Sequence, residues 1–135
     1  LIEDFPITFK DGKAVSVKAR KNQDALEQMI KMDEGAAKLG EVALIAYDSP
    51  IRETGILFYE TLFDENAACH FALGHCYETN LVGGADMSEE EVKAKGGNFS
   101  INHVDFMVGT KDLLVTGITK DGEEVTIFKN GTWAF

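Results

Sequence analysis

Residues 103–118 read HVDFMVGTKDLLVTGI, and residues 124–128 read EVTIF. The stretch holds three short runs rich in branched and aromatic residues, which is the composition of β-strands. The pairs Asp121-Gly122 and Asn130-Gly131 that follow suit the tight turns of hairpins. The sequence therefore predicts successive strands over 104–108, 113–118 and 125–128.

The N-terminal part carries one more strand signal and then changes period. Apolar residues alternate on both sides of Asp11-Gly12, which predicts a hairpin over residues 7–17. From Asn22, apolar residues recur at helical spacing toward Met32, with Asn22 as the expected N-cap. A shorter helical piece is expected over 36–39, ending at Gly40.

The middle of the chain alternates between apolar runs and polar connections. Residues 41–47 are mostly apolar and open with a carboxylate, which predicts a largely buried strand with Glu41 at its mouth. Residues 48–55 have the composition of a turn. The segment 80–100 is expected to leave the sheet as a lid or rim, with a short helix that begins at the capping-box pattern Ser88-x-x-Glu91.

These patterns predict an α+β fold, a mainly antiparallel β-sheet with a few short helices, in a single domain over residues 1–135. The 135 residues are 44% hydrophobic, which is enough for one core. The formal net charge is −10, and an acidic chain repels phosphate backbones and anionic lipid. We therefore expect neither nucleic acid nor membrane as a partner. No apolar run approaches the ~20 residues of a membrane helix. We interpret Cys69 and Cys76 as reduced thiols and expect a cytoplasmic protein.

The spacing His103-x-Asp105 is the strongest functional signal. On a β-strand it turns an imidazole and a carboxylate toward one face, where both can hold a cation. Three more oxygen and nitrogen donors lie upstream in or beside apolar runs, where a buried charge needs a partner or a metal. Mixed carboxylate and imidazole donors suit zinc, cobalt or manganese. The candidate metal ligands are Glu41, Glu65, His70, His103 and Asp105.

Each donor also has a purely structural interpretation. His70 fits a core histidine bonded to a carbonyl, His103 with Asp105 fits a strand-end ion pair, and Glu65 fits a turn residue. Five donors exceed the three protein ligands of a typical catalytic zinc, so a two-metal centre with a bridging carboxylate is the natural arrangement if they act together. A site for one metal, in a mononuclear hydrolase or a metal-storage protein, stays open.

Three segments resemble the C-terminal part of the aminopeptidase T family, also known as PepS or AmpS, of two-metal exopeptidases. They are Gly40-Glu41-Val42-Ala43-Leu44, the run TLFDENAACHFALG at 61–74, and Asn102-His103-Val104-Asp105-Phe106-Met107. The resemblance covers nearly the whole chain. It implies an enzyme that removes the N-terminal residue of peptides by means of two divalent metal ions.

The resemblance also implies roles for single residues. Glu41 would be the bridging carboxylate and a catalytic residue, and the other four donors would complete the two metal shells. Tyr77 matches a family tyrosine that stabilises the tetrahedral intermediate. His75 matches no ligand of the family, and a place at the rim of the site is expected for it.

Members of the family are about three times this length, carry an N-terminal domain and form homodimers through this half. The resemblance therefore implies the C-terminal catalytic portion of a two-domain aminopeptidase, without the N-terminal domain and without one further glutamate ligand. A homodimer is expected, with Trp133 and Phe135 packing against the partner. The alternative is a non-catalytic dimerisation or binding module whose carboxylate–histidine pairs are structural.

Overall fold

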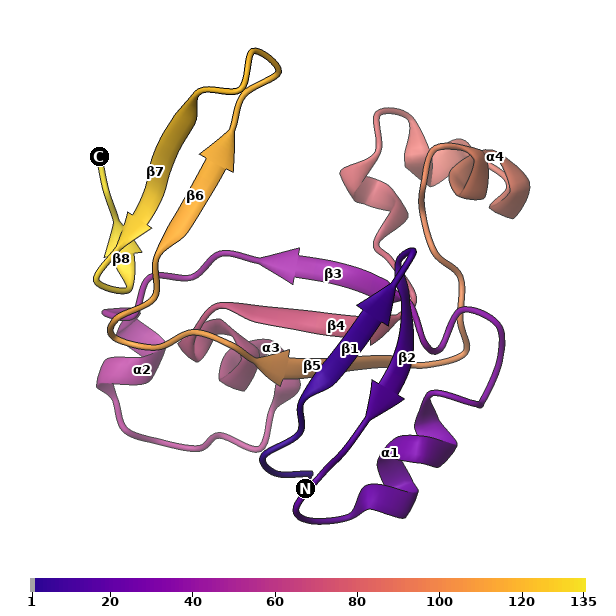
Figure 1. Cartoon of the computed structure of the whole chain (residues 1–135), viewed down its shortest axis with the longest axis horizontal. Coiled ribbons are helices and arrows are strands. Elements are labelled where there is room, and N and C mark those ends of the chain that lie inside the picture. Colours follow the sequence, from indigo (N-terminus) through magenta and orange to yellow (C-terminus); the bar gives the residue numbers. More distant parts are fainter. Residues whose placement is uncertain (1) are drawn as a thin grey trace. The chain divides into compact units, whose positions relative to one another are not determined.

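The computed structural model describes residues 2–135, which form short strands and helices in two compact units. The first unit comprises the described residues up to 41 together with 72–105, and the second comprises 42–71 and 106–135. Three small sheets have the strand orders β1-β2, β3-β4-β5 and β6-β7-β8 (Figure 1). The expected α+β class, with antiparallel sheets and few short helices, is confirmed.

The element bounds are as follows. The strands are β1 (Ile7–Lys10), β2 (Lys13–Val17), β3 (Leu39–Ala43), β4 (His70–Gly74), β5 (His103–Met107), β6 (Val115–Ile118), β7 (Glu124–Lys129) and β8 (Thr132–Trp133). The helices are α1 (Gln23–Met29), α2 (Pro50–Glu53), α3 (Thr61–Asp64) and α4 (Glu89–Ala94), with single 3-10 turns at η1 (Glu65–Ala67), η2 (Glu78–Asn80) and η3 (Gly84–Asp86).

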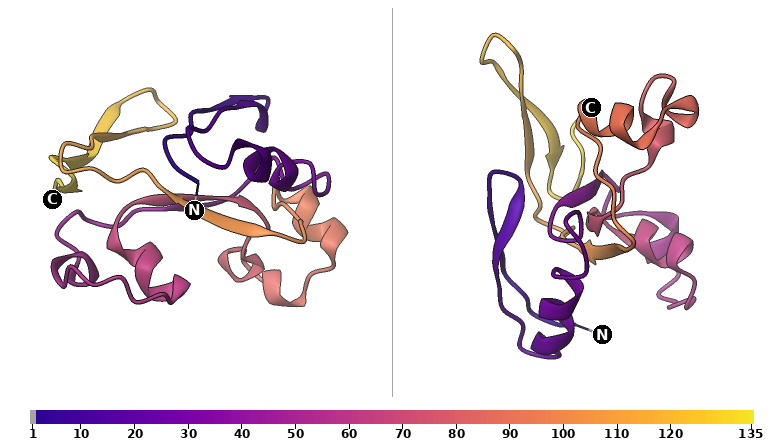
Figure 2. Two further views of the ribbon diagram at one scale, coloured as in Figure 1. Left: turned by 90° about the horizontal axis from the view of Figure 1, so that it is seen from below. Right: turned by 90° about the vertical axis from the view of Figure 1, so that its right-hand side faces the viewer.

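The first unit opens with the predicted hairpin. Strands β1 and β2 pair antiparallel with Ile7 opposite Val17. Both turn residues have positive φ, 51° at Asp11 and 76° at Gly12, which is the requirement of a type I′ turn. Helix α1 follows the open end of this hairpin, where the side-chain amide of Gln23 donates to the carbonyl of Val17 (Figures 1 and 2).

Two sequence expectations in this unit are wrong. Residues 36–39 form a turn and the start of β3. Ala36 and Ala37 are buried, and Ala14 N–H of the hairpin donates to the Ala37 carbonyl. Helix α1 also ends at Met29, three residues before Met32. Tertiary contacts override the local helical spacing in both places.

Strand β3 differs from its prediction in position and exposure. It runs from Leu39 to Ala43, so Glu41 is its central residue rather than its first, and Val42 is largely exposed. Gly40 belongs to the strand because a Cβ at this position would lie 2.3 Å from the carbonyl oxygen of His75. A glycine that reads as a stop signal is here a point of close backbone approach.

The end of β4 meets the beginnings of both neighbouring strands. Gly74 N–H donates to Lys38 O, and His75 N–H donates to Asn102 O, each at 2.8 Å. Because the end of β4 pairs with the start of β3 and with the start of β5, the sheet is antiparallel. The donor residues Glu41 and His103 therefore lie near the same end of β4.

The segment 80–100 leaves the sheet, as expected, and contains α4. The Ser88 hydroxyl accepts from Glu91 N–H while the Glu91 carboxylate accepts from Ser88 N–H, so the predicted capping box is present. The side chain of Val92 on this short helix is fully buried and belongs to the core of the first unit.

The second unit is built on a twisted antiparallel hairpin, β6–β7, extended by β8 (Figure 2). Phe128 on β7 is fully buried and contacts Trp133 edge-on, with ring centroids 4.5 Å apart. The predicted turn at 48–55 contains the one-turn helix α2, which Pro50 opens at a position where a missing N–H costs nothing.

Two further observations concern the cysteines and the helices. Cys69 and Cys76 are free thiols. Within residues 2–135, no helix has the length and apolar character needed to cross a bilayer.

Candidate metal centre

The first unit brings together three of the five predicted donors. His103 Nε2 lies 3.1 Å from Glu41 Oε2 and 3.3 Å from Asp105 Oδ1. Glu41 is held on β3, while His103 and Asp105 occupy alternate positions of β5 and so share one face of the strand. The three side chains are only 10–22% exposed. The result is a half-buried group of one imidazole and two carboxylates.

The hydrogen bond of His103 Nδ1 indicates which nitrogen of this ring faces the two carboxylates. Its Nδ1 lies 2.7 Å from the backbone carbonyl of His75, and since a carbonyl only accepts, Nδ1 carries the proton. In the neutral ring Nε2 then presents a lone pair toward two carboxylate oxygens. His103 Nε2 and Asp105 Oδ1 are buried and make no hydrogen bond of acceptable geometry with any described residue.

Buried acceptors that face one another are unfavourable unless a positive charge lies among them. A cation bound by Nε2 and the carboxylate oxygens would satisfy all of them. The Nδ1–H bond to a main-chain carbonyl is also the usual outer support of a metal-binding histidine. The residues of the first unit therefore fit a divalent metal ion.

Tyr77 lies beside this group. Its ring centroid is 5.1 Å from that of His103, with the planes inclined at 56°. Tyr77 directly precedes η2 and is 45% exposed, so one side of its ring faces the histidine while the residue still reaches solvent.

The other two predicted donors, Glu65 and His70, belong to the second unit. His70 opens β4 and is 1% exposed. Its Nδ1 lies 3.0 Å from the Ala68 carbonyl and donates there, as His103 Nδ1 does to the His75 carbonyl. Glu65 opens the 3-10 turn η1 and is half-buried.

Two contributors to this site have roles that the sequence analysis did not predict. One is the main-chain carbonyl of His75. Every residue has such a carbonyl, so the residue type does not predict its role. The other is Gly40, whose lack of a side chain lets β3 approach that same carbonyl. The only sequence signal for Gly40 is its place directly before Glu41.

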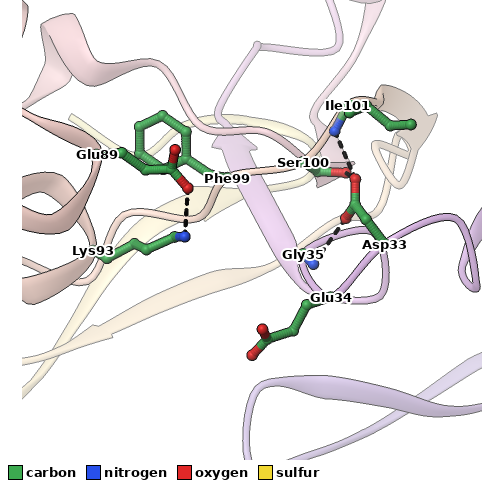
Figure 3. A pocket seen from close by; sticks show the side chains of 8 residues that line it. All are labelled: Asp33, Glu34, Gly35, Glu89, Lys93, Phe99, Ser100 and Ile101. Carbon is green, nitrogen blue, oxygen red and sulfur yellow. Dashed lines mark hydrogen bonds and ion pairs between the residues drawn. The ribbon is translucent and has the colours of Figure 1, made fainter.

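In a separate pocket of the first unit, Asp33 and Lys93 have partners among the lining residues, whereas Glu34 is exposed and its partner Lys38 lies outside the lining. Figure 3 shows Asp33 between the main chain of Gly35 and that of Ile101, and Lys93 paired with Glu89. The Asp33 carboxylate accepts four hydrogen bonds, and these lower its pKa, the bond from Ile101 N–H most of all. Asp33 therefore serves to hold the surrounding loops together.

Comparison with known proteins identifies the class. A family model described as thermophilic metalloprotease (M29) matches residues 1–133. The chain therefore belongs to the thermophilic metalloprotease (M29) family.

Individual relatives agree with this assignment. The chain is 53% identical over its whole length to aminopeptidase AmpS of Bacillus subtilis (strain 168) and 49% identical to aminopeptidase 2 of Geobacillus stearothermophilus, covering 33% of each. The structure of wild-type AmpT from Thermus thermophilus matches with a TM-score of 0.88 and 42% identity, over 99% of this chain and 32% of that one. The chain thus spans about a third of the length of the curated relatives it matches.

Proposed function

We propose that this chain is the C-terminal catalytic portion of a longer metal-dependent aminopeptidase. Membership of the metalloprotease family and the printed names of the relatives support this activity. The observation that carries it here is the Nε2 lone pair of His103, buried beside Glu41 and Asp105 without a hydrogen bond.

The proposed donor set joins the three residues of the first unit with Glu65 and His70 of the second. Two divalent ions are proposed, because five donors exceed the needs of one. Carboxylate and imidazole ligands without thiolate favour zinc, cobalt or manganese. Both histidines direct Nδ1 at a main-chain carbonyl, which is the usual outer support of a metal-binding histidine.

When bound, the metal ions polarise the substrate carbonyl and make a water molecule more acidic. Glu41 would hold the metal ions in its family-derived role, and a carboxylate of the site would accept a proton from the attacking water. The Tyr77 hydroxyl donates a hydrogen bond to the oxygen that becomes negative at the scissile carbonyl. The family-derived roles of Glu41 and Tyr77 thus agree with their places around His103.

Peptides with a free N-terminus are the proposed substrates. A peptide α-ammonium group is attracted to a site rich in carboxylates, and the net charge of −10 adds a favourable field. The same field disfavours nucleic acid and anionic membranes as partners.

We further propose a cytoplasmic homodimer. Free thiols at Cys69 and Cys76 suit a reducing compartment. Trp133 is 43% exposed and Phe135 is 90% exposed, and exposed aromatic residues at the end of the second unit suit an interface with a second copy.

The activity is tested on the whole protein with a dipeptide amide that has either a free or an acetylated amine. Cleavage only of the free amine, lost after dialysis against a chelator and restored by zinc, cobalt or manganese, is the expected result. Equal cleavage of both peptides, or activity that survives metal removal, contradicts the proposal. A protein that shows neither activity nor metal binding supports the alternative of a non-catalytic module.

A further inference from the structure

We propose that His75 is a positioning residue, whose side chain fixes the main chain that orients both His103 and Tyr77. The proposal deepens the proposed function, on which it rests for the role of His103 as a metal ligand. It assigns work to a histidine that binds no metal in the proposed site.

The main chain of His75 is hydrogen-bonded to two consecutive residues, Asn102 directly before β5 and His103 at its start. Its N–H donates to Asn102 O at 2.8 Å, and its carbonyl accepts from His103 Nδ1 at 2.7 Å. The second bond determines which ring nitrogen of His103 keeps a lone pair. Any shift of the His75 carbonyl therefore changes the direction and the tautomer of the His103 ring.

The ring of His75 is held on three sides. Nε2 lies 3.0 Å from Glu78 Oε1, Nδ1 lies 3.4 Å from Ser100 N, and the Phe99 ring meets it edge-on at 4.8 Å. A backbone N–H only donates, so Nδ1 is the acceptor and the proton of His75 is on Nε2, directed at Glu78. His75 thus has the opposite tautomer to His103, and a ring so held cannot rotate without losing one of these contacts.

The hydrogen bond between the side chains of His75 and Glu78 also spans Tyr77 in the sequence. It links residues three apart across Tyr77, immediately before η2, and so sets the course of the chain at the point where the tyrosine ring meets His103. The Glu78 carboxyl has a lowered pKa, first because its own backbone N–H donates to it and further through His75. It therefore remains an ionised acceptor for His75.

Strand β3 restricts the position of the His75 carbonyl on the side away from His103. A Cβ on Gly40 would lie 2.3 Å from this oxygen, so β3 packs directly against it, one residue before Glu41. The carbonyl oxygen of His75 thus lies between β3 and the His103 ring. In our proposal, the contacts of the His75 side chain fix the remaining freedom of this carbonyl.

The test measures the ring nitrogens of His103 by NMR on the full metal-free chain, and then its dissociation constant for zinc by calorimetry. The variants are His75→Ala and Glu78→Ala, with Glu78→Gln to keep an acceptor for His75. The matched control is Glu89→Ala, which removes an exposed ion pair to Lys93 in the same unit.

In the wild type we expect a single His103 tautomer with the proton on Nδ1. His75→Ala and Glu78→Ala should give mixed tautomers and weaken zinc binding about 10- to 100-fold, the usual effect of losing the outer support of a ligand. Glu78→Gln and Glu89→Ala should keep the wild-type values. If His75→Ala does not fold, Glu78→Ala decides the question, because it leaves His75 itself in place.

An unchanged His103 tautomer and unchanged zinc affinity in both alanine variants overturn the positioning role. Absence of zinc binding in the wild type overturns the proposed metal site instead. The tautomer measurement needs neither metal nor activity, so the two failures are distinguishable.

Discussion

His103 donates its Nδ1 proton to the main-chain carbonyl of His75, and its Nε2 consequently faces Glu41 and Asp105 as a lone pair. In the neutral ring this arrangement places a lone pair beside two carboxylates, and such a mixed set of donors suits a cation. The consequences of this arrangement are open to direct measurement.

Replacement of Glu41 by Gln should abolish aminopeptidase activity, with a loss of about a hundredfold or more in kcat/KM. The amide removes one negative charge from the donor set and so weakens its hold on both metal ions. Steady-state kinetics on the whole protein, with metal content measured in parallel, provides the check. Glu124→Gln on the exposed face of β7 is the matched control and should keep full activity. Near-normal turnover of Glu41→Gln would remove this residue from the mechanism.

Tyr77→Phe should lower kcat about 10²- to 10³-fold while KM and metal content stay close to wild type, because only the hydroxyl that stabilises the negative oxygen is lost. The phenyl ring can still pack beside His103. Tyr59→Phe is a suitable control, since Tyr59 is 89% exposed in the second unit. A change confined to KM would show that Tyr77 binds the substrate without assisting the chemistry.

Gly40→Ala should destabilise the protein by about 1–3 kcal/mol, the usual cost of overpacking. The new Cβ would meet two main-chain carbonyl oxygens, of Gly74 and His75, and neither is the free end of a flexible side chain. Denaturant unfolding measures the change. Val42→Ala on the same strand alters an exposed side chain and should cost much less. Equal stability of the two variants would mean that β3 can move away from β4 without loss.

The Asp33 carboxylate should make stability depend on pH in the acid range. Its pKa is lowered, chiefly by the hydrogen bond from Ile101 N–H, so between the folded and unfolded pKa values the unfolded state binds more protons. The stabilisation is complete above the ordinary aspartate range near about pH 4 and is lost as the pH falls through the folded value.

Asp33→Asn should therefore lower the melting temperature at neutral pH and flatten its decline below about pH 4. Melting curves across this range, with Asp121→Asn in an exposed turn as the control, test the assignment. A variant that keeps the wild-type acid profile would show that another carboxyl is responsible.

Much of the fold could be predicted because the signals are local. The Asp11-Gly12 turn, the Ser88–Glu91 capping box and the last strands follow from residue types at fixed spacing, and all are present. The turn at 36–39 could not be predicted, because burial of Ala36 and Ala37 and the hydrogen bond from Ala14 N–H to the Ala37 carbonyl outweigh helical spacing.

The site divides in the same way. The shared face of His103 and Asp105 follows from the alternation of a strand, whereas the approach of Glu41 depends on which strands are neighbours in the sheet. The His75 carbonyl carries no residue signature at all, so its bond to His103 becomes visible only in three dimensions. Assignment of Glu65 and His70 to the same centre remains a prediction.

The most direct test of the central claim is the metal content and melting temperature of the full chain with added zinc, cobalt or manganese, beside His103→Ala. We predict stoichiometric binding and a rise in melting temperature, since a ligand that binds only the folded state stabilises it. The His103→Ala variant should lose both effects, whereas Glu124→Ala should keep them. Absence of metal binding in the wild type, or an equal rise in His103→Ala, would contradict the claim that His103, Glu41 and Asp105 form a metal centre.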